Sequence, residues 1–474
     1  MRGVYGVEQV RTAEDALMAR LPEDALMARA ATGLAVECAA LLGRVYGARV
    51  ALLVGAGNNG GDALYAGAAL ARRGAAVRAL LLDAERAHAG GLAAFRAAGG
   101  RVVAIEPAAL DGVALVVDGI VGIGGRGSLR GAAVELAAAA RDTLTVAVDI
   151  PSGVDADTGA ADGDAVWADV TVTFGALKAG LLVGDGARRT GELRFVDIGL
   201  DATLPEADVH VLEAEDVARL LPTPGPADDK YTRGVTGLVA GSAAYPGAGV
   251  LSTGAAVCGG AGMVRYAGTA ADAIRARYPE VVVHEDARPS ELWVQAWVIG
   301  PGIGTDDSAR ALLADVLATD VPVIVDADAI TVLGQSPDPL AGRSVPTVLT
   351  PHDREFARIA EGPSADRIGS ARAAARDLGA TVLLKGDATV VAAPDGRAWI
   401  NRTGTPWLGT AGSGDVLSGL IGSLLASGLE APLAAAVGAY VHGVAGQLAA
   451  AVGPPSSADV LHSLRAALHH IAAG

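Results

Sequence analysis

Residues 409–419 read Gly-Thr-Ala-Gly-Ser-Gly-Asp-Val-Leu-Ser-Gly, which places the carboxylate of Asp415 inside a glycine-rich turn. Residues 412–414 are expected to open a helix, because apolar residues such as Leu420 and Leu424 continue at helical spacing. The free backbone N–H groups at such a helix start can bind a phosphate group. The turn therefore predicts an anion-binding site with an acid beside it.

The acid in this turn has two interpretations. Asp415 would accept a proton from a hydroxyl group while the turn neutralises a phosphoryl group in transfer. The alternative is structural, since an acidic residue is favourable in the first turn of any helix. The turn alone does not separate the two.

The bulk composition indicates an α/β protein with two or three domains. A chain of 474 residues is too long for one ordinary core. Hydrophobic residues make up 51% and aromatic residues only 4%, so the core consists of Ala, Val, Leu and Ile. The net charge of -16 and the pI near 4.9 argue against nucleic acid or an anionic membrane as partner, because both require a basic surface.

Several features indicate a cytoplasmic protein. Cys38 and Cys258 are far apart in apolar settings, which argues against a disulfide framework and fits a reducing compartment. The first residues lack a basic segment followed by an apolar stretch and a cleavage site, so no secretory signal is evident. Residues 431–453 are long enough to span a bilayer, but they are rich in Ala and Gly, which favours a buried helix.

Two blocks of alternating strands and helices follow each other along the chain. The order of the first block predicts a doubly wound, Rossmann-like sheet with its site at the carboxyl ends of the strands. Its strands are expected at 50–54, 77–82, 113–117 and 144–148.

The second block is also α/β, and it closes with helices only. Its strands are expected at 237–240, 293–299, 323–325, 347–349, 381–384 and 389–392. Between the blocks, the Pro-rich segment 220–229 breaks every periodic pattern. We therefore predict domains at 1–218 and 230–474, joined by a linker at 219–229.

The turn after the first strand reads Gly55-Ala-Gly-Asn-Asn-Gly-Gly-Asp62 and satisfies the Gly-x-Gly-x-x-Gly pattern of dinucleotide-binding folds. Asp83 even follows at a suitable distance for a ribose hydroxyl group. Two features oppose a dehydrogenase: consecutive asparagines fill the turn, and Asp62 would place a negative charge near a pyrophosphate. An oxygen-rich turn suits a hard cation or a polar ligand better. A structural turn without a ligand is the alternative.

Two further strands of the first block end in polar groups. Asp118 precedes the flexible loop 122–128, and Asp149 precedes Ile-Pro-Ser152. Each group by itself is a common turn device. Three polar strand ends in a doubly wound sheet nevertheless predict one pocket.

Together these motifs resemble the family of bifunctional NAD(P)H-hydrate repair enzymes. The resemblance rests on residues 58–62, on Asp149-Ile-Pro-Ser-Gly153 and on a ribokinase-like second half, and it runs from residue 7 to 470. In that family an epimerase domain is fused to an ADP-dependent dehydratase domain. The resemblance implies an amino-terminal Rossmann-like domain and a carboxy-terminal ribokinase-like α/β domain.

The activity implied by this resemblance is the repair of damaged nicotinamide cofactors. Hydrated NADH and NADPH (NADHX and NADPHX) carry a hydroxyl group on C6 of the nicotinamide ring, in R and S forms, and cannot deliver hydride. The first domain would interconvert the two forms. The second would dehydrate the S form with ADP as co-substrate, giving NAD(P)H, AMP and phosphate. A potassium ion and Mg²⁺ are implied in the same way.

In the second domain the resemblance implies a substrate group and a nucleotide group. The hydrated cofactor would contact Asp415, which is the expected base, together with Ala248, Gly302 and His352. The nucleotide would contact Lys385, Gly386, Asp387, Ala388, Thr389 and Gly414. His352 is alternatively an ordinary turn residue. Asp353 and Arg354 follow it where the family usually has Gly-Glu, which puts the local turn in doubt.

In the first domain the resemblance implies a potassium site and a substrate pocket. The potassium ion would be held by Asn59, Asp118 and Ser152. Asp149 is the candidate for acid–base catalysis, with a strand-end turn as the alternative role. The substrate would be lined by Asp149 and by Asn58, Asn59, Gly60, Gly61, Asp62, Gly122, Ile123, Gly124, Gly125, Arg126, Gly127 and Ser128.

Two other functions are compatible with parts of the sequence. A ribokinase-like, ATP-dependent kinase of a small hydroxymethyl compound would use Asp415 in the same way, with a ligand-binding Rossmann-like domain fused to it. The first half could alternatively be a binding module without chemistry. In each case the expected partners are small molecules, not nucleic acid or membrane. Apolar helices over 12–45 favour a homo-oligomer, a tetramer or larger.

Overall fold

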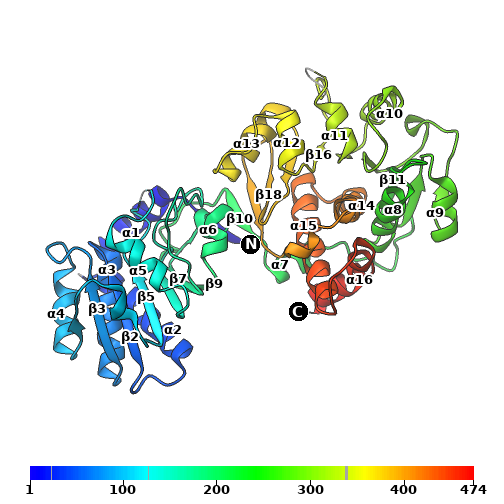
Figure 1. Ribbon diagram of the computed structural model, residues 1–474. Helices are drawn as coiled ribbons and strands as arrows, with labels where there is room; N and C mark the ends of the chain where they lie inside the picture. Colours follow the sequence, from blue (N-terminus) through cyan, green and yellow to red (C-terminus); the bar gives the residue numbers. More distant parts are fainter. Residues whose placement is uncertain (23, 126, 337–339, 474) are drawn as a thin grey trace. The chain divides into compact units, whose positions relative to one another are not determined.

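The computed structural model describes residues 1–22, 24–125, 127–336 and 340–473. The chain divides into two compact units: an amino-terminal domain at 3–207, and a carboxy-terminal domain that comprises 208–474 together with residues 1 and 2 (Figure 1). Both are α/β, as the sequence predicts.

The amino-terminal domain is built on a sheet with the strand order β4-β3-β2-β5-β6-β7-β9, in which all neighbouring strands are parallel. The chain leaves β2 toward one edge and returns at β5 to build the other half, so the order reverses between β2 and β5. Its elements are β1 (Arg2–Tyr5), α1 (Val7–Met18), α2 (Ala25–Leu42), β2 (Arg49–Val54), α3 (Asn58–Arg72), β3 (Ala76–Leu81), α4 (Ala89–Ala97), β4 (Arg101–Val102), β5 (Leu115–Gly119), α5 (Ala132–Ala139), β6 (Thr145–Val148), β7 (Val170–Phe174), β8 (Leu177–Lys178), α6 (Gly184–Arg189) and β9 (Glu192–Val196).

Alternation along β2 builds a core on each face of this sheet. Leu52 packs with α2, α3 and α4, whereas Leu53 packs against α5 on the opposite face. Successive side chains of a strand point to opposite faces, so a strand covered on both sides must be apolar throughout. This is why the continuous apolar run at 50–54 predicts the strand correctly.

The carboxy-terminal domain has the strand order β13-β12-β11-β14-β15-β16-β17-β18-β19-β10, parallel except for the antiparallel hairpins β17–β18 and β18–β19. Here the order reverses between β11 and β14. Its elements are β10 (Val209–Val211), α7 (Ala214–Leu220), β11 (Val235–Val239), α8 (Pro246–Cys258), β12 (Met263–Tyr266), α9 (Ala271–Arg277), β13 (Val282–Val283), β14 (Ala296–Ile299), α10 (Asp307–Leu317), β15 (Val323–Val325), α11 (Asp328–Leu333), β16 (Thr347–Leu349), α12 (Asp353–Ile359), α13 (Arg367–Leu378), β17 (Thr381–Leu384), β18 (Thr389–Ala392), β19 (Ala398–Asn401), α14 (Ser413–Ala426), α15 (Ala431–Ala450) and α16 (Ser457–Ala473).

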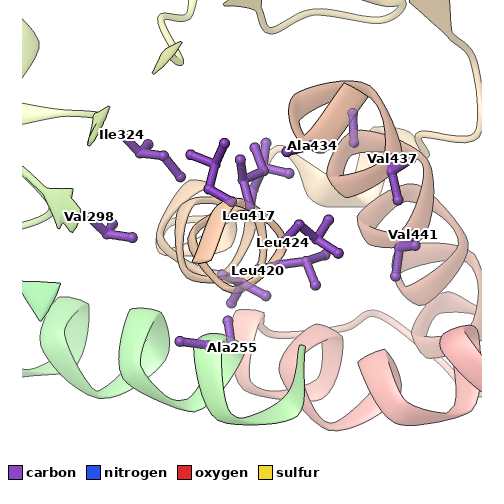
Figure 2. Packing of buried hydrophobic residues seen from close by; sticks show 14 of the residues in the cluster. Ala255, Val298, Ile324, Leu417, Leu420, Leu424, Ala434, Val437 and Val441 are labelled. Atoms are coloured by element: carbon purple, nitrogen blue, oxygen red, sulfur yellow. The ribbon is translucent and has the colours of Figure 1, made fainter. Parts of the chain in front are cut away.

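Helix α14 lies at the centre of the carboxy-terminal core. Figure 2 shows Leu417, Leu420 and Leu424 of this helix surrounded by side chains of the sheet, of α8 and of α15. Almost every residue of α14 after its first turn is buried. The packing therefore fixes the start of α14, and with it the glycine-rich turn, relative to the strands.

The domain boundary differs from the predicted linker at 219–229. β10 pairs with β19 of the carboxy-terminal sheet, and α7 packs on α15 and α16, so residues from 208 onward belong to the second domain. The Pro-rich segment is an exposed loop inside this domain, between α7 and β11. Its composition marks a break in secondary structure but does not show on which side the preceding helix packs.

Two helices of the described chain have the length and composition of a membrane span, α2 and α15. In α15, 72% of the most apolar 18-residue stretch is buried inside the domain, so core packing accounts for its apolar character. In α2 the corresponding fraction is 33%, and this helix packs on α3. Cys38 and Cys258 are both free, as expected.

Candidate functional site

A cavity of about 960 Å³ opens at the carboxyl ends of the strands in the amino-terminal domain, where the strand order reverses. It is bordered by the turns after β2, β5 and β6 and by α1 and α2. Of the predicted substrate residues, the cavity is lined by Asn58, Asn59, Asp62, Gly122, Ile123, Gly124 and Asp149. The structure thus brings the three polar strand ends into one pocket.

Asp149 follows β6 and forms a buried ion pair that the sequence analysis missed. Lys178 Nζ lies 2.5 Å from Asp149 Oδ1, and the lysine side chain is only 1% exposed. Thr173 Oγ1 and the Phe174 N–H group donate to the same oxygen, at 3.0 and 3.2 Å. Among the described residues these bonds all fall on Oδ1, which leaves Oδ2 for the cavity. The backbone of Asp149 has φ +66°, a strained value for a residue other than glycine.

Two further carboxyl groups face this cavity, Asp62 on α3 and Glu14 on α1. Burial raises the pKa of Asp62 well above its usual value, and the charges of Asp149 and Glu14 raise it further. Burial also raises the pKa of Glu14 to about 6, again with a contribution from Asp149. Asp62 Oδ1 is buried and has no hydrogen-bond partner within the described residues. The pocket therefore combines one paired carboxylate with two carboxyl groups that burial shifts toward the neutral form.

The residues predicted to hold potassium lie around the ends of β5 and β6. Asp118 is fully buried and accepts hydrogen bonds from Ser152 Oγ at 2.7 Å, from Ser152 N at 2.8 Å and from the Ile120 N–H group at 3.2 Å. Burial raises the pKa of Asp118 to about 6, although these hydrogen bonds lower it. In its hydrogen-bonded orientation the Asn59 amide donates to the Val148 carbonyl and accepts from the Gly122 N–H group. The donors to Asp118 within the described residues are all neutral.

The loop after β5 lies close against the turn after β2. A methyl group added to Gly55 would come within 1.9 Å of the Ile120 carbonyl oxygen, so only glycine fits there. Gly122, Ile123 and Gly124 line the cavity, whereas Gly125, Gly127 and Ser128 continue the loop beyond it, with Ser128 close to Gly163. Gly60 and Gly61 lie in the first turn of α3, packed against Gly55 and His88. Arg126 lies outside the described residues.

In the carboxy-terminal domain the glycine-rich turn opens α14 as predicted. Gly412 precedes the helix with φ +89°, a left-handed conformation that favours glycine, and no side chain caps the helix start. Ser413 Oγ lies 3.3 Å from Nε2 of His442, which is buried on α15. Burial lowers the pKa of His442 to about 4, so its imidazole is neutral at neutral pH. The Ser413 N–H group donates to the Thr410 carbonyl oxygen at 3.3 Å, so within the described residues the N–H groups of Gly414 and Asp415 are the ones at this helix start that remain available to an anion.

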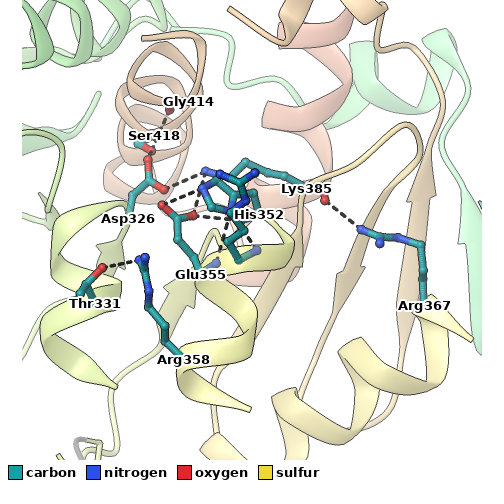
Figure 3. Close-up of polar contacts among 10 residues, drawn as sticks. Asp326, Thr331, His352, Glu355, Arg358, Arg367, Lys385, Gly414 and Ser418 are labelled. Atoms are coloured by element: carbon teal, nitrogen blue, oxygen red, sulfur yellow. Dashed lines mark hydrogen bonds and ion pairs between the residues drawn. The ribbon is translucent and has the colours of Figure 1, made fainter. Parts of the chain in front are cut away.

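A network of charged residues adjoins this helix start. Asp326, at the end of β15, accepts from Lys385 Nζ at 3.0 Å and from Ser418 Oγ of α14 at 2.5 Å (Figure 3). Lys385 also lies 3.8 Å from Glu355. A methyl group added to Gly414 would be 3.4 Å from Lys385 Nζ, so the lysine and the glycine-rich turn face the same space.

Asp415 lies beside this network in a half-buried position. Burial raises the pKa of Asp415 to about 7, and the charges of Asp326, Asp328 and Glu355 raise it while Lys385 lowers it. A carboxyl group that titrates near neutral pH at a helix start is typical of a catalytic acid or base. The favourable-acid interpretation does not explain this shift, because a helix start by itself stabilises the charged form.

His352 is exposed and caps α12. Its ring Nδ1 accepts hydrogen bonds from the backbone N–H groups of Arg354 and Glu355, at 3.1 and 3.2 Å. The backbone N–H group of His352 donates to Glu355 Oε2 at 3.0 Å. The local turn therefore forms despite the departure at Asp353 and Arg354. Asp353 binds Arg367, which donates to the Lys385 carbonyl oxygen at 2.8 Å (Figure 3). The unusual residue thus supports the predicted nucleotide turn.

The remaining predicted residues fall into two places. Gly302 lies after β14 and packs against Ala248 of α8, at the point where the strand order reverses, as expected for substrate loops. Lys385, Gly386, Asp387 and Ala388 form the connection between β17 and β18, and Thr389 begins β18.

A separate cavity of about 550 Å³ borders β10, α7 and β19 and contains none of the predicted residues.

Comparison with known proteins agrees with this arrangement. A family model described as NAD(P)H-hydrate dehydratase matches residues 236–463, and one described as YjeF-related protein N-terminus matches residues 23–180. The chain is 53% identical over 443 residues to the bifunctional NAD(P)H-hydrate repair enzyme Nnr of Mycobacterium tuberculosis, covering 92% of each chain. It is 51% identical over 479 residues to the enzyme of the same name from Mycobacterium leprae, covering 99% of this chain and 98% of the other.

Solved structures match the carboxy-terminal part. The ADP/ATP-dependent NAD(P)H-hydrate dehydratase of Bacillus subtilis, co-crystallised with ATP and Mg²⁺, matches with a TM-score of 0.50 at 30% identity, covering 55% of this chain and 98% of that one. A ribokinase-like superfamily protein of Enterococcus faecalis matches with a TM-score of 0.52 at 25% identity, covering 57% and 99%.

The fold and the two sites define a two-domain α/β enzyme in which a Rossmann-like domain precedes a ribokinase-like, nucleotide-binding domain. The chain belongs to the family of bifunctional NAD(P)H-hydrate repair enzymes, because relatives of that name are more than 50% identical over nearly its whole length.

Proposed function

We propose that this chain repairs hydrated NADH and NADPH, with epimerisation in the amino-terminal domain and ADP-dependent dehydration in the carboxy-terminal domain. The observation that carries the proposal is the presence of two chemically different sites in one chain. One is a carboxyl-rich cavity lined by Asp62, Glu14 and Asp149, and the other is a helix start flanked by Lys385 and Asp415.

In the dehydratase site Asp415 is the proposed base. It would take the proton of the C6 hydroxyl group, so that the oxygen attacks the terminal phosphorus of ADP and AMP departs. The resulting phosphate leaves the ring far more readily than hydroxide does. Lys385 and the N–H groups near Gly414 would balance the charge of the transferred phosphoryl group.

The remaining dehydratase residues have positioning roles in this proposal. Ala248, Gly302 and His352 would contact the hydrated cofactor. Nδ1 of His352 caps α12, and its Nε2 lies 3.5 Å from Glu355 Oε1. Residues Gly386, Asp387, Ala388 and Thr389 would contact the nucleotide. Asp326 accepts hydrogen bonds from both Lys385 and Ser418, and it thereby links the proposed nucleotide turn to α14.

In the epimerase site Asp149 is the proposed acid–base group, since it lines the cavity and Lys178 binds its Oδ1. The substrate would be bound by residues 58–62 and 122–128 together with Asp149. Epimerisation at C6 moves protons but requires no net oxidation, so carboxyl groups suffice for the chemistry.

A potassium ion fits the residues at the ends of β5 and β6. Asp118 is a buried carboxylate with only neutral donors among the described residues, and Ser152, Asn59 and the Val121 carbonyl add oxygen atoms nearby. Such an ion would neutralise Asp118 and stiffen the loop 122–128.

Magnesium would arrive with the nucleotide, as in the co-crystallised Bacillus subtilis dehydratase. No group of three or more His, Cys, Asp or Glu side chains in the described residues is arranged to hold a metal by itself. The nucleotide phosphates would therefore supply several of its ligands.

The alternative, an ATP-dependent kinase of a small hydroxymethyl compound, would use the same α14 start. What favours dehydration is the fused amino-terminal domain with its own carboxyl-rich cavity. We also propose small-molecule partners only, a cytoplasmic location and a homo-oligomer. Free cysteines fit a reducing compartment, and exposed apolar residues such as Met18, Val36 and Tyr46 offer a surface for self-association.

The test is the recovery of reduced cofactor from its hydrated form. Purified protein with ADP and Mg²⁺ is expected to restore the absorbance of reduced nicotinamide, and ATP should be tried in parallel. Omission of nucleotide is the control. An unchanged spectrum together with phosphorylation of a sugar or pyrimidine alcohol would instead support the kinase.

A further inference from the structure

We propose that Asp62 is the proton donor of the epimerase site, delivering its proton to the ring nitrogen N1 while Asp149 accepts the proton of the C6 hydroxyl group. This inference rests on the proposed function and divides between two residues the acid–base role so far given to Asp149 alone.

The placement of Asp62 is the first argument. Its side chain lines the cavity yet is only 9% exposed, and its Oδ1 has no hydrogen-bond partner within the described residues. Burying a polar oxygen without a partner is unfavourable, so such a group in a native fold calls for an explanation. Within the described residues Asp62 also forms no ion pair with a cation. A carboxyl group kept for its proton explains its position.

The contrast with Asp149 is the second argument. Lys178, a buried lysine beside the cavity, is bound to Asp149, Thr173 and the Phe174 carbonyl, and is therefore committed to one carboxylate. Two carboxyl groups on one cavity, one paired with an ammonium and one not, favour opposite protonation states. Asp149 enters the reaction as a carboxylate, and Asp62 enters as a neutral acid.

The charges around Asp62 support this division. Glu14 of α1 and Asp149 after β6 both raise the pKa of Asp62, in addition to burial. Lys178 faces Asp149, and Arg11 and Asp15 lie beside Glu14 on α1. His88, at the start of α4, borders the same cavity and uses its Nδ1 to cap that helix. Glu14 therefore acts on Asp62 through its charge.

The chemistry requires an acid as well as a base. Asp149 Oδ2 takes the hydroxyl proton, the O–H electrons form the C6=O bond, and the C6–N1 bond breaks. Its electron pair takes the proton of Asp62, giving an open-chain aldehyde, an N1–H group, a protonated Asp149 and an ionised Asp62. Rotation about C5–C6 presents the other face of the aldehyde. Ring closure reverses each proton transfer, so atoms and electrons balance without a further reactant.

Breaking the C–N bond rather than the C–O bond follows from the division of labour between the domains. Loss of the hydroxyl group would leave an iminium ion, which needs only to lose a C5 proton to become NADH. If the epimerase cavity expelled hydroxide, the nucleotide used by the second domain would be superfluous. Protonation of N1 by Asp62 directs cleavage to the C–N bond.

The experiment follows exchange between the R and S forms by chromatography, without nucleotide, as a function of pH. In the wild type, kcat/KM should fall at high pH as Asp62 is ionised. Asp62→Asn should lower exchange by about 10²–10⁴-fold and abolish the alkaline fall. Glu14→Gln removes a negative charge near Asp62, so it should keep the alkaline fall but move it to lower pH. Glu135→Gln, an exposed acid on α5, is the matched control.

Each outcome decides the question. Exchange that persists in Asp62→Asn, or a wild-type profile without an alkaline fall, would overturn the assignment of Asp62. Loss of the alkaline fall in Glu14→Gln alone would transfer the role to Glu14. Because the amino-terminal domain has its own core, thermal denaturation of the Asp62→Asn protein followed by circular dichroism, compared with Glu135→Gln, reports whether this domain is folded. A wild type that exchanges no epimers contradicts the proposed function instead.

Discussion

Residues that work together in the amino-terminal site lie far apart in the chain. Asp149 and Lys178 are separated by 29 positions, yet Lys178 is the strongest partner of the predicted acid–base group. Sequence motifs identify Asp149 because it ends an apolar strand. They do not identify Lys178, which ends the two-residue strand β8 and looks in the sequence like any solvent-exposed lysine. The signal that was available is a lone lysine between apolar residues 176–182.

The protonation of Asp415 gives a prediction at the same scale. Since burial and nearby carboxylates raise the pKa of Asp415 to about 7, and the base must be ionised, dehydration should fall about tenfold for each pH unit below 7. Asp415→Asn should lower the rate by at least about 10²-fold at every pH. Steady-state rates between pH 5 and 9 check both expectations.

A measurement of stability distinguishes a loss of catalysis in Asp415→Asn from unfolding of the protein. A carboxyl group whose pKa is raised by folding stabilises the fold at low pH, and this contribution is lost as the pH rises through about 7. Asp415→Asn should therefore be at least as stable as the wild type at pH 8. Asp307→Asn, which alters an exposed acid in the first turn of α10, is the matched control. Undiminished dehydration in Asp415→Asn would remove Asp415 from the mechanism.

At the scale of elements, strands that read as continuous apolar runs were predictable. The inner strand β7, although buried throughout, was not predicted, because Thr171 and Thr173 interrupt its apolar run. The strands at 323–325, 347–349, 381–384 and 389–392 have the predicted bounds, because continuous apolar runs end in polar residues. β9, β10 and β12 were not predicted. They are short, partly exposed or interrupted by a charge such as Arg265, so their pairing depends on neighbours that the local sequence does not reveal.

The close packing of α14 on α8 gives a prediction at this scale. A methyl group added to Gly419 would lie 2.0 Å from the Ser252 carbonyl oxygen, so the two helices would have to move apart. Gly419→Ala should therefore destabilise the carboxy-terminal domain by about 1–3 kcal/mol and displace the glycine-rich turn, despite the better helix propensity of alanine. Chemical denaturation and the KM for ADP measure the two effects.

Gly362→Ala is the control for this prediction, since the nearest atom to its added methyl group is 3.9 Å away. Epimer exchange should be unaffected in both variants, because the amino-terminal domain has its own core. A Gly419→Ala protein with wild-type stability would show that the helices are not in tight contact at this point.

For the whole molecule, the dehydratase site depends on the epimerase site for part of its substrate. The dehydratase is expected to accept only the S form, so complete repair of a mixture requires the epimerase to convert the R form. Each proposed site is formed by residues of its own domain, so we expect the substrate to leave one site and bind at the other. Repair therefore requires both activities in the solution but not both in the same chain.

This gives the prediction for variants with one site inactivated. Asp149→Asn with ADP should convert the S form and stop, apart from slow spontaneous exchange, whereas Asp415→Asn should exchange epimers without producing reduced cofactor. A mixture of the two proteins should convert the whole epimer mixture, at a rate that rises with the concentration of the slower partner. The absorbance of reduced nicotinamide measures the reaction of Asp149→Asn and that of the mixture, and chromatography of the R and S forms measures the exchange by Asp415→Asn. A mixture that stops where Asp149→Asn stops would show that the substrate does not leave the chain between the two steps.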